Sequence, residues 1–164
     1  MTTFDLIKLK FYEQQYILEI NRKFNLRNQT FFLLAMFILY STYIFSYIAH
    51  HYNDQYSPLI KAYYIIIAMG LVWCFSLLMC CLFRIKIENN KFIILKATMI
   101  PKPEHIGKYY ETATNRESYE HMLACYKDNI QINYKVNDHV AYTLHKLNIV
   151  MSITLLGFLP VFFF

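Results

Sequence analysis

Histidine is the side chain of this sequence whose chemistry is easiest to test by spacing, because it ligates metals and carries protons. Two ligands share one helical face only when they lie three or four residues apart. No two of the six histidines have that spacing, and neither a phosphate-binding loop, a nucleophile elbow nor a cysteine pair at metal spacing is present. We therefore expect no catalytic residue, no metal, no cofactor and no enzymatic activity. The histidines are His50, His51, His105, His121, His139 and His145.

Basic residues interleaved with tyrosines after residue 100 suggest a different chemistry. Cationic side chains suit a phosphate and tyrosine rings suit a stacked base, so this pattern is typical of nucleotide binding. The alternative is that the same cations set membrane topology and attract anionic headgroups, and from composition alone we favour this alternative. The candidate ligand-binding residues are Lys108, Arg116, Tyr119 and Lys127.

Three of these residues, Arg116, Tyr119 and Lys127, belong to the last third of the chain. From Arg116 to Phe164 it has no Gly before Gly157 and no Pro before Pro160. Nothing earlier in it has to break a helix. Alternating steps of four and three predict a helix that packs along one seam, in which Asn133 and Asn137 are polar layers that fix register and partner number. We predict that six seam residues, from Tyr126 through Leu144, join copies of the chain. The seam contains Tyr119, Leu123, Tyr126, Ile130, Asn133, Asn137, Val140, Leu144 and Leu147.

The composition that surrounds this helix is that of a membrane protein. Of 164 residues, 57% are hydrophobic and only 16% are charged, and two uncharged runs of 20 and 22 residues are each long enough to cross a bilayer. We predict an all-α membrane protein with transmembrane helices at about 30–49, 62–83 and 147–164. The third is the weakest, because Asn148 and Pro160 interrupt it, and it could be short, tilted or re-entrant.

The predicted parts are an amphipathic helix within 1–29, a two-span hairpin over 30–83, a cytoplasmic region over 84–146 and a C-terminal transmembrane helix over 147–164. The long cytoplasmic helix is continuous with the third span. The amphipathic helix could lie on the bilayer or pack on the seam, and we favour packing. Its apolar face contains Leu9, Tyr12, Tyr16, Ile20 and Phe24.

Several shorter features allow two interpretations. Residues 84–96 are either a small hairpin with a turn at Asn89-Asn90 or a continuation of the second span. Asn148 and Ser152 either hydrogen-bond to another helix, which we favour, or line a pore. Trp73 is expected to pack within the protein. Cys80-Cys81 is expected to be buried apolar surface rather than a palmitoylation site.

The basic residues predict the topology. Five lie before the first span, one (Lys61) lies between the first two spans, and ten lie from Arg84 to Lys146. The positive-inside rule therefore places the N-terminus and residues 84–146 in the cytoplasm, with 50–61 outside. We expect no signal peptide, since the first apolar run begins only after about thirty residues. A bacterial inner membrane is favoured over an organellar one.

The block from Asp128 to Pro160 resembles the C-terminal block of small transmembrane effectors of bacterial anti-phage nucleotide-signalling systems, the Pycsar type. The likeness consists of an Ile-rich helix, then Lys146, then a final apolar helix with Gly157 and Pro160. It covers about a fifth of the chain in sequence, and the whole chain in the order of its parts. The resemblance implies an effector that a cyclic nucleotide triggers to assemble and damage the membrane. It identifies no ligand-binding residue.

Our hypothesis is a membrane-disrupting effector of an abortive anti-phage response, gated by a cytoplasmic cyclic nucleotide through oligomerisation. The expected partners are the lipid bilayer, further copies of the chain and that nucleotide, but no nucleic acid. One alternative is a structural accessory subunit of a larger membrane complex, such as an organellar respiratory assembly. A second is a pore or small channel that acts without a ligand.

Overall fold

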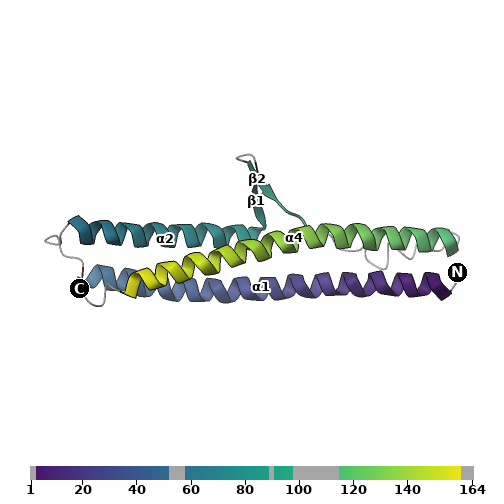
Figure 1. Cartoon of the computed structure of the whole chain (residues 1–164), viewed down its shortest axis with the longest axis horizontal. Helices are drawn as coiled ribbons and strands as arrows, with labels where there is room; N and C mark the ends of the chain where they lie inside the picture. The colour runs from purple at the N-terminus through teal and green to yellow at the C-terminus, as the bar shows by residue number, and fades with distance from the viewer. Residues whose placement is uncertain (1–2, 52–57, 89–90, 98–114, 160–164) are drawn as a thin grey trace. The chain divides into compact units, whose positions relative to one another are not determined.

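Three long helices and one small hairpin make up the fold of the part of the chain that the structure describes. The computed structural model describes residues 3–51, 58–88, 91–97 and 115–159. In chain order the elements are α1 (Thr3–His51), α2 (Pro58–Phe83), β1 (Ile85–Glu88), β2 (Lys91–Ile94) and α4 (Asn115–Phe158), as Figure 1 shows. By length and composition, α1, α2 and α4 can each cross a membrane. The prediction of a helical, multi-pass membrane protein is confirmed at this level.

α1 joins two parts that the sequence analysis treated separately. It runs for 49 residues, so the predicted amphipathic helix and the first span are one helix without a break near residue 29. The physical reason is the junction itself: residues 25–29 contain neither Gly nor Pro, and nothing there interrupts the backbone hydrogen bonds. α4 is likewise continuous from Asn115 to Phe158. Residues 160–164 of the predicted third span lie outside the described residues.

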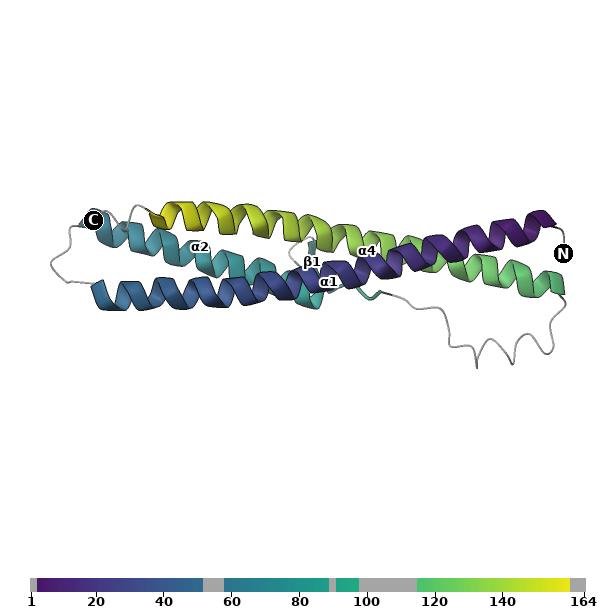
Figure 2. The same cartoon turned by 90° about the horizontal axis from the view of Figure 1, so that it is seen from below.

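The chain divides into two compact units. The first unit contains Met1–Leu26 and Leu95–His139, and the second contains Arg27–Ile94 and Val140–Phe164. In the first unit α1 and α4 run in the same direction (Figure 2), because Tyr12 approaches Lys127 and Arg22, farther along α1, approaches Asp138, farther along α4. This contact confirms that the amphipathic part of α1 packs on the seam.

The contact in the first unit follows the predicted periodicity closely. Along α4 the buried residues of this unit are Leu123, Asn133, Val136 and Asn137, three of which are seam positions. On α1, four of the five predicted apolar-face residues are half-buried. The exception is Phe24, which is 50% exposed, so its assignment to the packed face was wrong.

The second unit has its own apolar core between three helices. α2 buries one stripe at steps of three and four residues: Tyr64, Ile67, Leu71, Cys74, Leu78 and Cys81. Ile44 of α1 and Phe158 of α4 pack against that stripe. α2 runs opposite to α1, because Phe37 meets Phe75 while Ile44, farther along α1, clusters with Tyr64, which is earlier in α2. α4 continues its seam here with Val140, Leu144 and Leu147, all buried.

Two expectations for the spans need correction. Trp73 does not pack within this unit: it is 62% exposed, because it lies off the buried stripe of α2. Asn148 and Ser152 are exposed on α4 rather than facing the core. Cys81 is buried, as expected for a small apolar residue, and Cys80 is half-buried.

Residues 85–94 form the hairpin and do not continue α2, so the fold is not entirely helical. β1 and β2 are antiparallel, with Ile85 opposite Ile94 and Glu88 opposite Lys91. Arg84 ends α2 in the left-handed region, with φ 52°, and its N–H donates to the Cys81 carbonyl at 3.3 Å. Such a residue reverses the chain direction after a helix. The predicted turn at residues 89 and 90 lies outside the described residues.

Candidate functional site: a polar cluster between α1 and α4

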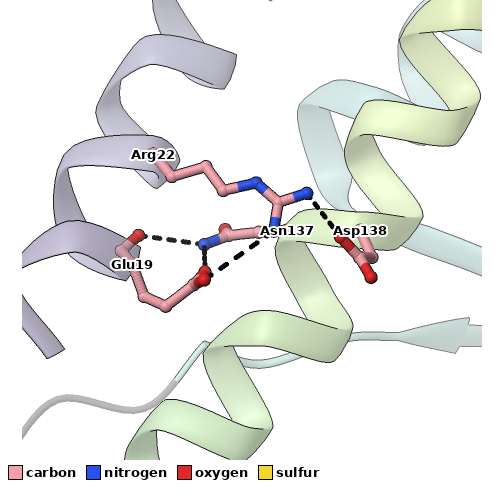
Figure 3. Close-up of polar contacts among 4 residues, drawn as sticks. All are labelled: Glu19, Arg22, Asn137 and Asp138. Carbon is pink, nitrogen blue, oxygen red and sulfur yellow. Dashed lines mark hydrogen bonds and ion pairs between the residues drawn. The ribbon is translucent and has the colours of Figure 1, made fainter. Parts of the chain in front are cut away.

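A cluster of four polar residues holds α1 against α4 within the first unit (Figure 3). The Asn137 side-chain amide donates to two acceptors of Glu19, its backbone carbonyl and its carboxylate Oε2, each at 2.9 Å. Asn137 is only 2% exposed. One amide of α4 therefore hydrogen-bonds to both the backbone and the side chain of Glu19 on α1. These two bonds fix the two helices in one register.

Arg22 completes the cluster from α1. Its guanidinium lies 3.7 Å from the Glu19 carboxylate, one turn away on the same helix, and also pairs with the Asp138 carboxylate of α4. The same guanidinium lies over the Tyr134 ring, 5.6 Å from the ring centroid. Arg22 is thus held by one carboxylate on its own helix and by one carboxylate and one ring on α4.

The cluster combines two carboxylates, one cation and one amide, so the side chains carry a formal charge of −1 if all three charged groups are ionised. The Glu19 side chain is only 15% exposed, whereas the Asp138 side chain is 44% exposed and remains in contact with water. A carboxylate as buried as that of Glu19 is costly unless it is hydrogen-bonded and paired, and Asn137 and Arg22 supply these partners. Polar layers of this kind specify which helices pair and in what register more than they add stability.

An aromatic layer lies on the N-terminal side of the polar cluster. The rings of Tyr16 and Tyr126 meet edge to face at 5.8 Å, and the Lys127 ammonium lies 5.4 Å from the centroid of the Tyr12 ring. Burial raises the pKa of Tyr126, and the nearby Glu13 carboxylate and Tyr16 raise it further. Tyr126 therefore stays neutral at physiological pH and acts as a packing group.

The structure brings only some of the predicted ligand-binding residues together. Arg116, Tyr119 and Lys127 lie near one face of α4, but Arg116 and Lys127 are three turns apart, roughly 16 Å along the axis. Arg116 is exposed and pairs with Glu120 at 3.2 Å. Lys127 contacts Tyr12 of α1. Lys108 lies outside the described residues.

In the first unit, the predicted oligomer seam of α4 is covered by α1 of the same chain. Tyr126 contacts Tyr16, and Asn137 contacts Glu19, both on α1. Asn133 is 1% exposed, and Ile130 is half-buried. Val140 and Leu144 are buried within the second unit. The six seam residues therefore pack within one copy of the chain in this structure.

Spacing arguments missed Glu19, Arg22 and Asp138 as parts of the cluster. One signal was available for Glu19, because it follows Tyr12 and Tyr16 at helical spacing and so places a carboxylate on the packed stripe of α1. A carboxylate on one stripe and two asparagines on the other together indicate a polar layer. Arg22 and Asp138 gave no comparable signal, since both resemble ordinary surface charges.

The second unit contains an open groove lined by both amide and apolar side chains. Three amide side chains, from Asn28 and Gln29 of α1 and Asn148 of α4, line it together with Phe32 and Leu33. Its volume is about 500 Å³, and it is open to the outside. Ser152 lies exposed on α4, one turn beyond Asn148. Polar side chains thus face outward within α1 and α4, close to where the predicted first and third spans begin.

Among the described residues, no group of three or more His, Cys, Asp or Glu side chains is arranged to hold a metal ion. His121 Nε2 lies 3.6 Å from Cys125 Sγ, one turn away, but a structural zinc site takes four ligands.

No protein-family model, no curated protein and no solved structure matches this chain.

Proposed function

We propose that this protein is a membrane-disrupting effector whose activity depends on assembly in the bilayer and is gated by a cyclic nucleotide in the cytoplasm. The observation that carries the proposal is the outward-facing polar surface of the second unit, formed by Asn28, Gln29, Asn148 and Ser152. Amides exposed to lipid are unfavourable, whereas amides that meet another copy of the chain or water are not. A polar surface on potential spans is what a leak pathway between copies requires.

The first unit supplies an element that a ligand can bias. α1 and α4 are each continuous from this unit into the apolar residues of the second. In this proposal, a change in how the two helices pair at Glu19 and Asn137 is passed along these continuous helices. A nucleotide that binds the cationic and aromatic face of α4, at Arg116, Tyr119 or Lys127, would act on this pairing. To act in this way, the nucleotide has to bind one arrangement of α1 and α4 more tightly than the other, by a few kcal/mol.

The test is dye release from liposomes that contain the purified full-length chain, with and without a panel of cyclic nucleotides. Release with one nucleotide and not with the others supports the proposal and names the signal. Release without any nucleotide contradicts the gating and indicates a ligand-independent pore. If correctly inserted protein gives no release under any condition, the effector function is wrong, and an accessory subunit of a larger membrane complex becomes the better explanation.

A matched pair of variants tests the observation itself. Asn148→Leu removes an outward-facing amide, while Ile149→Leu alters the neighbouring residue, which is 46% exposed and apolar. We expect the first variant to lose release and to self-associate less in detergent, and the second to behave like the original chain. Equal dye release by both variants would show that the polar surface is not needed for the activity.

A further inference from the structure

The hairpin formed by β1 and β2 has two chemically different faces. In an antiparallel ladder, directly opposite residues lie on the same face. The pairs Ile85–Ile94 and Ile87–Phe92 make one face, which is entirely apolar. The pairs Lys86–Ile93 and Glu88–Lys91 make the other, which carries three of its four side chains charged.

The apolar face is largely uncovered. Ile87 is 60% exposed, Phe92 75% and Ile94 65%. Figure 1 shows the two strands projecting from the end of α2 rather than lying along it. A two-stranded hairpin alone is only marginally stable in water, so an exposed apolar face of this kind needs something to cover it.

The position of the hairpin and its charge both point to a lipid surface. β1 begins two residues after α2 ends at Phe83, so if α2 crosses the bilayer the hairpin cannot leave the membrane surface. Each strand has four residues and reaches only about 13 Å, so the hairpin stays close to the end of α2. Residues 84–96 contain four basic side chains and one acidic one, a balance that anionic headgroups attract.

A second copy of the hairpin would cover the apolar face but would not use the basic charge. Packing two apolar faces together turns the charged faces of both copies outward, so the excess of basic side chains would remain in water, whereas anionic headgroups would pair with it. Lys86 already pairs with Glu88 at 2.9 Å, which leaves the single acidic side chain of residues 84–96 engaged within its own copy. The basic residues are Arg84, Lys86, Lys91 and Lys96.

We propose that the hairpin is a membrane-surface anchor, with Ile87, Phe92 and Ile94 inserted among the lipids and the lysines of the opposite face among anionic headgroups. This inference is independent of the effector function and needs only that α2 spans the bilayer. The anchor would hold the cytoplasmic end of α2 at a fixed depth, as interfacial segments do.

The test uses the single tryptophan of the chain. Trp73→Phe removes it, and a new tryptophan is then placed at one of two adjacent positions, Phe92→Trp or Ile93→Trp, in the full-length chain. These positions lie on opposite faces of the hairpin, and neither substitution alters a charge. Both proteins are reconstituted in vesicles of phosphatidylcholine, with or without phosphatidylglycerol, that contain lipids carrying a quencher near the headgroup.

We expect Phe92→Trp to emit at shorter wavelength and to lose most of its emission to the lipid quencher, more so with phosphatidylglycerol. Ile93→Trp should instead be quenched by iodide in the water. Equal lipid quenching at both positions, or iodide quenching of both, would overturn the anchor. Short-wavelength emission at position 92 that resists the lipid quencher and depends on protein density would also overturn it, because a second copy would then be the cover.

Discussion

Asn137 is the residue on which the pairing of α1 and α4 depends most directly. Its amide donates both bonds to Glu19, and an amide can do this whereas a carboxylate cannot. Asn137→Asp keeps the size of the side chain but sets a third carboxylate beside Glu19 and Asp138, with Arg22 as the cation. We expect a loss of about 1–3 kcal/mol in the stability of the pair at neutral pH. Hydrogen exchange of the α1 amides around residue 19 measures it.

The control for this prediction is a second substitution in the same cluster. Glu19→Gln combined with Asn137→Asp reverses donor and acceptor, since the glutamine amide can donate to the new carboxylate. Protection should return in part in the double variant, because the side-chain bond is restored but the bond to the residue-19 carbonyl is not, and the double-mutant cycle isolates the coupling energy. If Asn137→Asp alone exchanges no faster than the original chain, the cluster does not set the pairing.

At this scale the sequence predicted one of the four residues of the cluster, Asn137, together with its neighbour in the seam, Asn133. Asn133 and Asn137 interrupt an otherwise apolar heptad, and a polar residue at such a position must meet a partner, so their burial could be anticipated. The partner of Asn137 could not be predicted, because Glu19 lies 118 residues away in the chain. Only the fold decides which stripe faces the seam. Arg22 and Asp138 look like surface charges until α1 and α4 are placed together.

Among the elements, α2 and α4 approach each other closely at Gly70. A Cβ atom at this position would lie 2.7 Å from Thr154 Oγ1 and 3.2 Å from its Cγ2. Thr154 is held in place, since its hydroxyl donates to the Val150 carbonyl at 2.8 Å. We expect Gly70→Ala to force the helices apart and to cost about 1–3 kcal/mol, measured by thermal unfolding in detergent.

The other helical glycine provides the matched comparison. A Cβ atom at Gly157 would meet nothing within 4 Å, so Gly157→Ala should be neutral or raise stability slightly through helix propensity. Adding Thr154→Ala to Gly70→Ala removes the two clashing atoms and should restore much of the loss. A Gly70→Ala chain as stable as Gly157→Ala would show that α2 and α4 do not pack as described.

The elements themselves were predictable where periodicity is long and uninterrupted. The seam of α4 and the buried stripe of α2 both follow steps of three and four residues. The joining of two helices into α1 was not foreseen, because a change from mixed to apolar composition suggests a boundary although no residue there breaks a helix. Residues 85–94 were ambiguous, since a four-residue strand is too short for its period to exclude a helix.

For the whole molecule, the directions of the helices within the second unit bear on topology. α1 and α4 run in the same direction there, since the pocket pairs Asn28 with Asn148 and, farther along, Tyr43 meets Phe158. α2 runs the opposite way. Three successive crossings of a bilayer require this alternation. The packing of the second unit is therefore compatible with all three helices crossing the membrane side by side.

Which side faces the cytoplasm depends on the charges. Five basic residues precede the first span and ten lie from Arg84 to Lys146, against Lys61 alone between the first two spans. We predict that alkaline phosphatase inserted in the 52–57 connector is active in a bacterial host, whereas the same enzyme after Lys96 is inactive and a fluorescent protein there is bright. The reverse pattern would contradict the orientation. It would also move the polar cluster of Glu19 and Asn137 to the side opposite the cytoplasm, where no cytoplasmic nucleotide could reach it.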